Sequence, residues 1–579
     1  MELFYTDEKN VLIVISLLKK YGIKNVIASP GTTNVTFVGS LQHDPFFNIY
    51  SAADERSAAY MACGLAEETN EPVVITCTGA TASRNYVPGL TEAYYRKLPV
   101  LAITATQNPM KIGHHIPQII DRSVIQNDIA KYNLTVSYVH DAEEEWACQA
   151  NVNKAILELY RNGGGPVLLN LETRYCPSFS TKNLPNVKKI ERITFRDKYP
   201  NIKNGNIAIY VGAHKKWTDE ETVAVDRFCE NNNAVVFCDQ TSNYKGKYRI
   251  LRDVLFYNYV ENVEISKISL MIHIGNISSG QCYYAPQEVW RVNPDGEVRD
   301  TFQKLTNVFE MEEQDFFEYY ANNSNGSKKT TYYELCKSTY DEYVSKLQDL
   351  PFSNVWIAQQ LSKRLPENSV LHLGIINTLR SWNIFEIPSS VLSYSNTGGF
   401  GIDGDVSSMI GASLANQNKL YYCVLGDLAF FYDMNSIGNH VVGNNVRILV
   451  INNGRGTEFR LNGNPAAKFG EDADLYMAAA GHYGNKSQEL LKHYAEDLGF
   501  EYMSCSNKDE FSAVCEKFVN PVIGEKPILF EVFTESKNET IALDMVKALS
   551  APANSELKKA IKNVLGDQTV NKIKKIIRK

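Results

Sequence analysis

Short apolar runs alternate with helical patterns along the first third of the chain. Patterns of buried strands, rich in Val, Ile and Leu, occur at 25–28, 73–76, 100–104 and 167–170. Between them, 58–68 and 144–160 show the apolar spacing of helices with one buried face. Strands that alternate with helices indicate βαβ units around a parallel sheet, so the pattern predicts an α/β fold.

The same rhythm returns twice more. In the middle third, strand patterns at 206–211, 234–237 and 270–274 accompany a helix at 219–230. In the last third, strand patterns occur at 370–373, 391–393, 420–425, 446–451 and 528–532. Polar stretches at 175–204 and 322–331 separate the three series. We therefore predict three consecutive doubly wound parallel-sheet domains followed by a tail, at 1–180, 190–330, 345–550 and 551–579.

Composition narrows the range of partners. A net charge of −7 over 579 residues offers no global field for holding nucleic acid. No apolar run approaches the roughly 18 residues of a membrane-spanning helix, and no signal peptide is recognisable, so we expect a cytoplasmic protein. Eleven cysteines without a C-x-x-C pair indicate reduced, buried thiols. The basic tail predicts at most weak contact with an anionic membrane surface.

Two motifs in the last third indicate different ligands, and both include Asp427. The residues 399–404 fit G-x-G-x-x-G, and Asp427 follows at the distance of a dinucleotide fingerprint. Asp427, however, comes directly after a buried strand, and Asn453 follows the next strand. Adjacent parallel strands bring their carboxyl ends together, and carboxylate and amide oxygens suit Mg²⁺, which shares its ligands with substrate phosphates. The second pattern predicts a magnesium site.

At this point the sequence resembles the thiamine diphosphate (ThDP) enzymes that act on 2-oxo acids, across all three predicted domains. The resemblance implies that Asp427, Asn453 and the backbone carbonyl of Arg455 bind Mg²⁺. It also implies ThDP as cofactor, in contact with Ser29, Gly31, Gly79, Gly401, Ile402, Gly426, Leu428, Ala429 and Phe459. In this family Ile402 would hold ThDP bent, so that its amino group meets the thiazolium carbon.

Glu55 is the expected activating carboxylate. It follows a β-rich run and begins a helix of small residues, as the family's glutamate does. A carboxylate on the aminopyrimidine ring of ThDP favours the imino form, whose nitrogen removes the thiazolium proton. Gln118 falls where many relatives hold an active-site glutamine. His114, His115 and Glu458 resemble the groups that move protons in pyruvate-decarboxylase-like members.

Within the family, the segments 292–295, 394–404 and 426–435 resemble the 2-succinyl-5-enolpyruvyl-6-hydroxy-3-cyclohexene-1-carboxylate synthases. These enzymes decarboxylate 2-oxoglutarate and add the carbanion to isochorismate, so they need several cations. This chain keeps Arg380, the candidate for the substrate carboxylate. Cations expected elsewhere are replaced at Thr32, Thr33, Gln107, Thr397 and 278–280. Because unpaired buried carboxylates are costly, the losses predict a different substrate pair.

The sequence thus predicts a ThDP- and Mg²⁺-dependent decarboxylase or carboligase. Its substrates would be a small 2-oxo acid and either a proton or an aldehyde or ketone acceptor. The resemblance also implies a homodimer or a dimer of dimers, because in this family the glutamate and the diphosphate site come from different chains. Two alternatives stay open: a nucleotide-dependent oxidoreductase that uses the glycine motif, and a catalytically silent scaffold.

Overall fold

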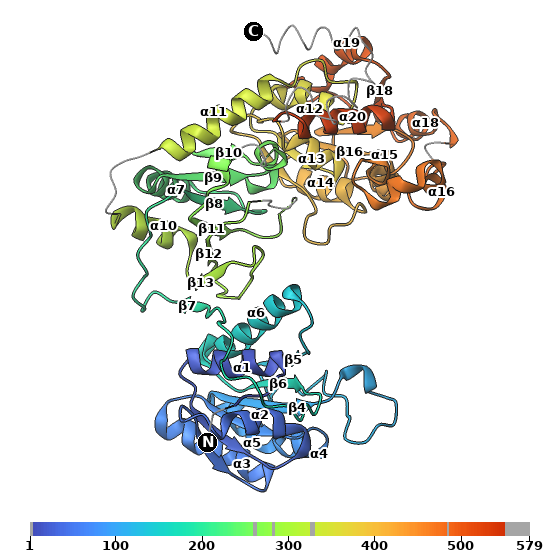
Figure 1. The fold of residues 1–579 in the computed structure, drawn as a ribbon. Coiled ribbons are helices and arrows are strands. Elements are labelled where there is room, and N and C mark those ends of the chain that lie inside the picture. The colour runs from blue at the N-terminus through green and yellow to red at the C-terminus, as the bar shows by residue number, and fades with distance from the viewer. Residues whose placement is uncertain are drawn as a thin grey trace. The chain divides into compact units, whose positions relative to one another are not determined.

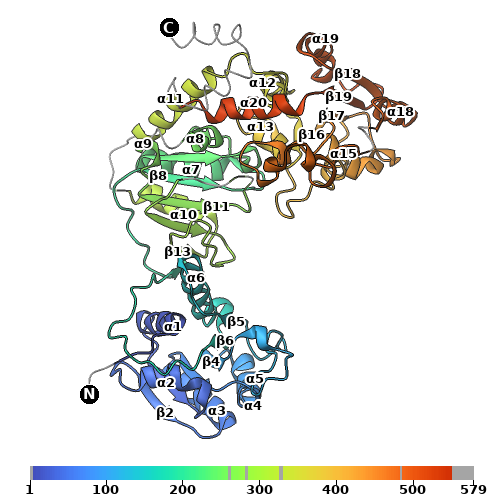
Figure 2. The ribbon, with the colours of Figure 1, turned by 45° about the vertical axis from the view of Figure 1, so that its right-hand side comes forward.

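The structure, a computed structural model, describes residues 4–258, 263–278, 280, 284–324, 330–482 and 486–550 (Figures 1 and 2). These residues form two compact units, each described here by itself. The first comprises the chain up to Tyr199 together with Asn293–Met311. The second comprises Pro200–Val292 and the described residues from Glu312 onward. The basic tail predicted at 551–579 lies outside the described residues.

The first unit is built on a six-stranded parallel sheet in the order β2-β1-β3-β4-β6-β5. Its strands are β1 (Asn25–Ala28), β2 (Asn48–Ser51), β3 (Val73–Cys77), β4 (Val100–Thr106), β5 (Tyr132–Val136) and β6 (Val167–Glu172). Its helices are α1 (Lys9–Lys20), α2 (Val35–Leu41), α3 (Glu55–Thr69), α4 (Thr81–Asn85), α5 (Val87–Arg96) and α6 (Ala142–Glu158). The central strands β1, β3, β4 and β6 are almost fully buried because helices cover both faces of the sheet.

The core of this unit consists of two hydrophobic clusters, one on each face of the sheet. One packs α1 and α6 against one face, and the other packs α3 and α5 against the opposite face, an arrangement that can be followed in Figure 1. The unit also contains a short parallel pair, β7 (Glu191–Ile193) with β13 (Leu305–Phe309). The boundaries predicted at 180 and 190 stay a prediction.

Close packing between α3 and α5 leads to a stability prediction. A Cβ added at Gly89 of α5 would lie 2.4 Å from the Cβ of Ala59 in α3, whereas one added at exposed Gly64 of α3 would meet nothing within 4 Å. We expect Gly89→Ala to lower the free energy of unfolding by about 2 kcal/mol, because the two helices must separate. Gly64→Ala should raise it by about 0.5–1 kcal/mol. Urea denaturation measures both, and similar effects at the two sites would contradict the packing.

The second unit begins with parallel strands in the order β10-β9-β8-β11-β12. They are β8 (Ile207–Val211), β9 (Ala234–Cys238), β10 (Arg249–Leu251), β11 (Leu270–Ile274) and β12 (Glu288–Val292). The accompanying helices are α7 (Asp219–Asn232), α8 (Asp253–Tyr257), α9 (Val263–Ser266), α10 (Glu313–Asn322) and α11 (Thr331–Ser345). Dinucleotides bind such sheets where the strand order reverses, here between β8 and β11. Backbone hydrogen bonds from Gly212 to Ile274 and from Asn276 to Ala213, of 3.0 and 2.8 Å, join the two loops at that point.

The third sheet repeats the topology of the first. Its order β15-β14-β16-β17-β19-β18 is the same 2-1-3-4-6-5 sequence of parallel strands. The strands are β14 (Val370–Leu373), β15 (Leu392–Tyr394), β16 (Tyr421–Gly426), β17 (Val446–Asn452), β18 (Glu501–Cys505) and β19 (Ile528–Phe533). The helices are α12 (Asn354–Leu361), α13 (Asn377–Trp382), α14 (Asp405–Ser413), α15 (Asp427–Asp433), α16 (Ala473–Tyr476), α18 (Leu490–Asp497), α19 (Lys508–Phe518) and α20 (Ser536–Lys547). The α/β class and the three parallel sheets are confirmed.

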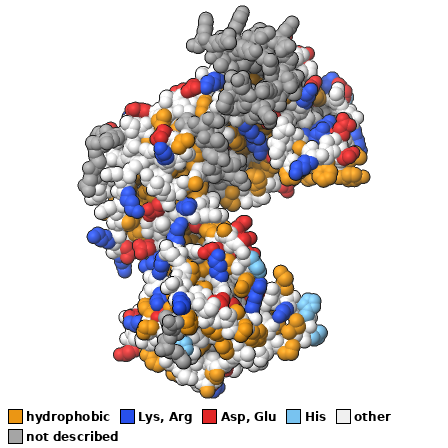
Figure 3. Space-filling view, viewed as in Figure 1, with side chains coloured by type: hydrophobic (Ala, Val, Ile, Leu, Met, Phe, Trp, Pro, Cys, Tyr) orange, Lys and Arg blue, Asp and Glu red, His pale blue; other side chains and the backbone are white. Residues whose placement is uncertain are grey.

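The cysteines, the hydropathy of the helices and the surface charges bear on the expectations from composition. Every cysteine among the described residues is a free thiol, and all but Cys176 are buried. No helix in the described part of the chain is long and apolar enough to cross a membrane. On the face seen in Figure 3, basic and acidic side chains are interspersed rather than gathered by sign.

Candidate functional site

The predicted residues of the first unit gather at one edge of its sheet. Because all six strands are parallel, the loops that follow β1, β2, β3 and β4 leave from the same edge. These loops carry Ser29 and Gly31, Glu55, Gly79, and the histidines with Gln118, respectively. Residues predicted from four separate segments therefore share one edge, as a cofactor site at the carboxyl ends of strands requires.

Glycines are needed where two of these loops meet. A Cβ at Gly31 would lie 2.5 Å from the Cβ of Thr78, and one at Gly79 would lie 3.2 Å from the carbonyl oxygen of Ala105. Thr33 and Thr78 share a hydrogen bond between their hydroxyls. Ala80, directly after Gly79, has φ 58° and ψ −139°, a strained conformation for a residue with a Cβ. Strain of this kind is typical of loops shaped for a ligand.

Glu55 lies at the first turn of α3 and is held in place by its neighbours. The side chain of Asp54 caps the helix by accepting hydrogen bonds from the backbone N–H groups of Arg56 and Ser57. Asn85 Nδ2, from α4, donates to Glu55 Oε2 at 3.2 Å. Glu55 is only half-buried, so its carboxylate is oriented by protein while part of it stays accessible to a ring bound at this edge.

The loop after β4 carries both exposed and buried side chains. His114, His115 and Gln118 are exposed, and their side chains make no hydrogen bond to the described residues. His115 and Gln118 adopt positive φ values of 55° and 65°. Arg122, from the same loop, turns inward beside Gly79 and is only 6% exposed. Burial lowers the pKa of Arg122 to about 10. The proton-moving role predicted for the two histidines stays a prediction.

The second cluster lies at the carboxyl edge of the third sheet. Asp427 follows β16 and is 2% exposed. Its Oδ2 accepts a hydrogen bond from the backbone N–H of Gly454 at 3.0 Å. Asn453 follows the neighbouring strand β17, and its Oδ1 accepts from Thr457 at 2.8 Å. The sequence expectation that these two oxygen ligands sit at adjacent strand ends agrees with this geometry.

The donor set around Asp427 fits a metal that completes its shell on a phosphate. Among the described residues there is no group of three His, Cys, Asp or Glu that could hold an ion by itself. One carboxylate, one amide oxygen and a backbone carbonyl leave coordination positions for diphosphate oxygens and water, as Mg²⁺ prefers. His482 Nε2 lies 2.7 Å from Asp427 Oδ2 and orients the carboxylate. Arg455 turns its guanidinium to Asp474 at 2.6 Å, so only its backbone can serve a metal.

Apolar predicted residues pack around the same turn. A Cβ at Gly456 would lie 3.3 Å from the ring of Phe459 and 3.5 Å from the side chain of Leu428. Gly426 caps α15 in extended conformation, and Ala429 lies in its first turn. These contacts hold Leu428 and Phe459 beside the loop that carries Asn453.

The glycine motif at 399–404 forms the loop between β15 and α14. Gly404 has φ 132°, which favours glycine, and a Cβ at Gly401 would lie 2.3 Å from Oδ1 at the end of the Asp403 side chain. Ile402 lies in this loop at the edge shared with Asp427. Directly after the motif, burial raises the pKa of Asp405 to about 7, with further contributions from Asp433 and Asp403. Asp427 is engaged with Gly454 and His482 and is not positioned as the ribose ligand of a dinucleotide fold.

Arg380 and Glu458 form an ion pair that sequence reasoning did not foresee. Arg380 Nη1 lies 2.8 Å from Glu458 Oε2 and also donates to Asn377 Oδ1 at 2.8 Å. Both side chains are largely buried, with about a quarter of each exposed. The role predicted for Arg380, holding a substrate carboxylate, therefore meets a competing carboxylate from the chain itself.

Comparisons with known proteins show the family of this chain. Residues 11–125 match the family model described as thiamine pyrophosphate enzyme, N-terminal TPP binding domain. The chain is 30% identical over 576 residues to 2-succinyl-5-enolpyruvyl-6-hydroxy-3-cyclohexene-1-carboxylate synthase of Phocaeicola vulgatus, covering 93% of this chain and 98% of the relative. The enzyme of the same name from Bacteroides thetaiotaomicron is 29% identical, with 92% and 97% covered. The chain therefore belongs to the family of thiamine diphosphate-dependent enzymes, and the resemblance seen in the sequence is confirmed together with its cofactor.

Among solved structures, the thiamine diphosphate-dependent 4-hydroxybenzoylformate decarboxylase of Rhodococcus jostii RHA1 aligns with a TM-score of 0.41 at 15% identity. The alignment covers 91% of this chain and 99% of that chain.

Three residues of these edges carried no signal in the sequence. His482 and Asn85 reach Asp427 and Glu55 through tertiary contacts that no motif describes. Ile376, just before α13, has φ 67° and ψ −109°, which is strained for a β-branched residue. The sequence contains no signal that predicts a positive φ at this isoleucine.

Proposed function

We propose that this ThDP-dependent enzyme requires Mg²⁺ and decarboxylates a 2-oxo acid. The resulting carbanion is then either protonated or added to a carbonyl acceptor. The observation that carries the proposal is the pair of equivalent sheet edges. One presents Glu55 with Ser29, Gly31 and Gly79, and the other presents Asp427 beside Asn453. A nucleotide-dependent oxidoreductase would leave both sets unused.

Each residue has a distinct task in this proposal. ThDP, when bound, would supply a thiazolium group that can stabilise the negative charge left when CO₂ departs. Glu55, held by Asn85, would keep a proton on the aminopyrimidine ring of the cofactor. Asp427, Asn453 and the backbone carbonyl of Arg455 would hold Mg²⁺. His114, His115 and Gln118 line the first edge, where an imidazole can move a proton to or from substrate oxygen.

The charge balance at the second edge favours substrates with few carboxylates. The name of the relatives describes a product with succinyl, enolpyruvyl and carboxylate groups, which carries several negative charges. Here Arg380 is already neutralised by Glu458 at 2.8 Å. A carboxylate brought to this place without a free cation would lose several kcal/mol of hydration. We therefore propose a donor or acceptor with fewer carboxylates than the relatives' product.

The direct test is a screen of 2-oxo acids for CO₂ release with ThDP and Mg²⁺, with and without aldehyde and ketone acceptors. Pyruvate, branched-chain and aromatic 2-oxo acids, and 2-oxoglutarate cover the relevant side chains. CO₂ release from a monocarboxylic 2-oxo acid supports the proposal. ThDP binding without release from any acid would indicate a silent scaffold, and 2-oxoglutarate with isochorismate as the preferred pair would contradict the substrate argument.

The ion pair itself predicts a change of specificity. Glu458→Gln removes the competing charge while keeping a hydrogen-bond acceptor for Arg380, so KM for 2-oxoglutarate should fall about tenfold relative to KM for the preferred substrate. Glu516→Gln, which breaks the surface pair with Arg364, is the matched control and should change neither value. Steady-state kinetics on the two acids measures the ratio, and an unchanged ratio in Glu458→Gln would contradict the assignment.

We also propose that the active enzyme is a homodimer or a dimer of dimers, because in the resembling family the two edges come from different chains. Sedimentation of the ThDP-loaded protein tests this, and a catalytically active monomer would contradict it.

A further inference from the structure

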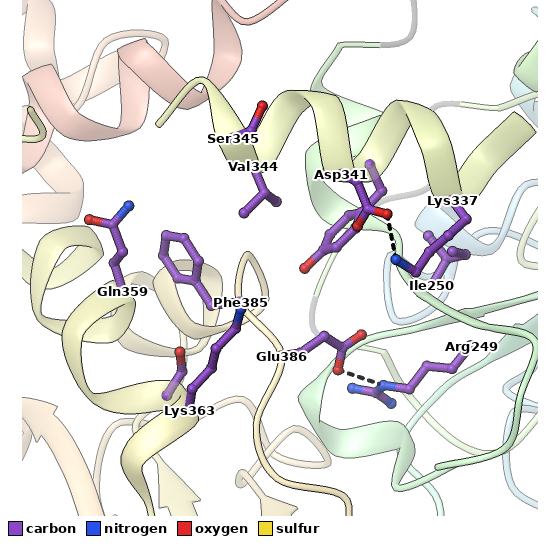
Figure 4. Close-up of a pocket in the computed structure, with 12 residues that line it drawn as sticks. Arg249, Ile250, Lys337, Asp341, Val344, Ser345, Gln359, Lys363, Phe385 and Glu386 are labelled. Atoms are coloured by element: carbon purple, nitrogen blue, oxygen red, sulfur yellow. Dashed lines mark hydrogen bonds and ion pairs between the residues drawn. The ribbon is translucent and has the colours of Figure 1, made fainter. Parts of the chain in front are cut away.

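A cavity of about 480 Å³ lies within the second unit. It is bounded by β10, by α11, by the end of α12 with the turn Ser362–Arg364 that follows it, and by the loop at Phe385 and Glu386 (Figure 4). Its volume is in the range of small-molecule sites. None of its lining residues is assigned to cofactor, metal or substrate above.

Two ion pairs account for both acidic groups that line the cavity. Glu386 Oε2 lies 2.9 Å from Arg249 Nε, and Asp341 Oδ2 lies 2.5 Å from Lys337 Nζ (Figure 4). The Lys337–Asp341 pair is on the exposed surface of α11, about half accessible. The Arg249 side chain is only 8% exposed, so its pair belongs to the interior wall.

Donors remain after these pairs are formed. Arg249 Nη1 donates to the carbonyl oxygen of Tyr244 at 2.8 Å, but the buried Nη2 has no hydrogen-bond partner among the described residues. The buried Ser362 hydroxyl likewise has none. Lys363 forms no ion pair or hydrogen bond with the described part of the chain, and Figure 4 shows its side chain extending toward the cavity. A buried guanidinium nitrogen and a buried hydroxyl without partners cost free energy unless a ligand satisfies them.

The surroundings add an apolar surface. Lys245 interacts with Arg249 and Glu386, and its pKa is lowered to about 7 by burial and, to a smaller extent, by Arg249. Ile250 and Phe385 line the cavity and are 1% and 4% exposed. The cavity thus combines unpaired donors and excess cationic charge with an apolar wall.

We propose that this cavity binds a small organic anion whose carboxylate or phosphate group contacts Arg249, Ser362 and Lys363, and whose apolar body packs on Ile250 and Phe385. Arg249 Nη2 carries the donors that no described residue uses, because Nε donates to Glu386 and one N–H of Nη1 donates to Tyr244. Glu386 lies beside it and opposes the anion.

Calorimetric titration of the full-length protein, loaded with ThDP and Mg²⁺ at 0.15 M ionic strength, tests the proposal. The probes are benzoate, phenyl phosphate and the neutral benzyl alcohol. We expect at least one anionic probe to bind ten or more times more tightly than benzyl alcohol. The tighter of benzoate and phenyl phosphate identifies the head group. Equal binding of all three, or no binding, would overturn the proposal.

Four variants assign the binding to this cavity. Lys363→Gln and Ser362→Ala should each weaken the preferred anion about fivefold or more. Glu386→Gln should strengthen it, because the opposing charge is removed while an acceptor for Arg249 remains. Lys346→Gln is the matched control, since Lys346 directly follows α11, which bounds the cavity, but pairs with Glu342 and does not line the cavity, and should bind as wild type does. Affinity that is unchanged in both Lys363→Gln and Glu386→Gln would show that the anion binds elsewhere and would overturn the proposal.

Discussion

Glu55→Gln is expected to reduce CO₂ release at least a hundredfold while ThDP remains bound. The amide has nearly the shape of the carboxylate and can still accept from Asn85 Nδ2, so the first turn of α3 and its Asp54 cap should stay intact. What is lost is the negative charge that keeps a proton on the aminopyrimidine ring. A hundredfold loss corresponds to about 2.7 kcal/mol of barrier. Steady-state CO₂ release and calorimetric ThDP affinity measure the two halves of the prediction.

The control for this substitution is Glu68→Gln, near the other end of the same helix. Glu68 is exposed and forms no ion pair with another described residue, so the loss of its charge should leave turnover unchanged. Asn85→Ala, which removes the orienting contact, should lower kcat less than Glu55→Gln does. Retention of more than about a tenth of the activity in Glu55→Gln, under roughly 1.4 kcal/mol, would refute the role of Glu55.

Strand positions could be predicted because parallel strands covered by helices must be apolar on both faces. The patterns at 25–28, 270–274 and 370–373 coincide with β1, β11 and β14, and the other predicted strands differ from the structure by one or two residues at their ends. The pairing of β7 with β13 was harder to predict. β7 lies in a polar stretch that resembles a linker, and its partner β13 is more than a hundred residues away along the chain. Pairing over that distance leaves no periodic signal.

The candidate site divides along the same line. Asp427 and Asn453 could be placed together from sequence, because the carboxyl ends of neighbouring parallel strands must meet. Side-chain partners could not. Arg380 and Glu458 are 78 residues apart, and each alone has the composition of a substrate-binding or proton-moving group. Their 2.8 Å contact changes the interpretation of both, since a cation that is already paired is no longer a free carboxylate site.

The second large effect concerns the metal. Asp427→Asn should weaken the apparent affinity for Mg²⁺ at least tenfold, and that for ThDP with it, because a neutral amide is a poorer ligand than a carboxylate. The amide oxygen can still accept from the backbone of Gly454, so the turn that carries Asn453 should keep its shape. Asn453→Ala should act in the same direction, and Asn453→Asp, which retains an oxygen ligand, should lose less.

Titrations of Mg²⁺ at fixed ThDP, followed by activity and by calorimetry, measure these shifts. Excess Mg²⁺ should partly restore turnover in Asp427→Asn, because the remaining ligands and the diphosphate still define the position. It should not restore Glu55→Gln, whose defect lies on the pyrimidine ring. Asp472→Ala, an exposed carboxylate of the same unit, is the control for general charge effects and should titrate as wild type does. Unchanged Mg²⁺ and ThDP affinity in both Asp427→Asn and Asn453→Ala would contradict the proposal that Mg²⁺ binds at this edge. Asp427 and Asn453 are the two side chains proposed as its ligands.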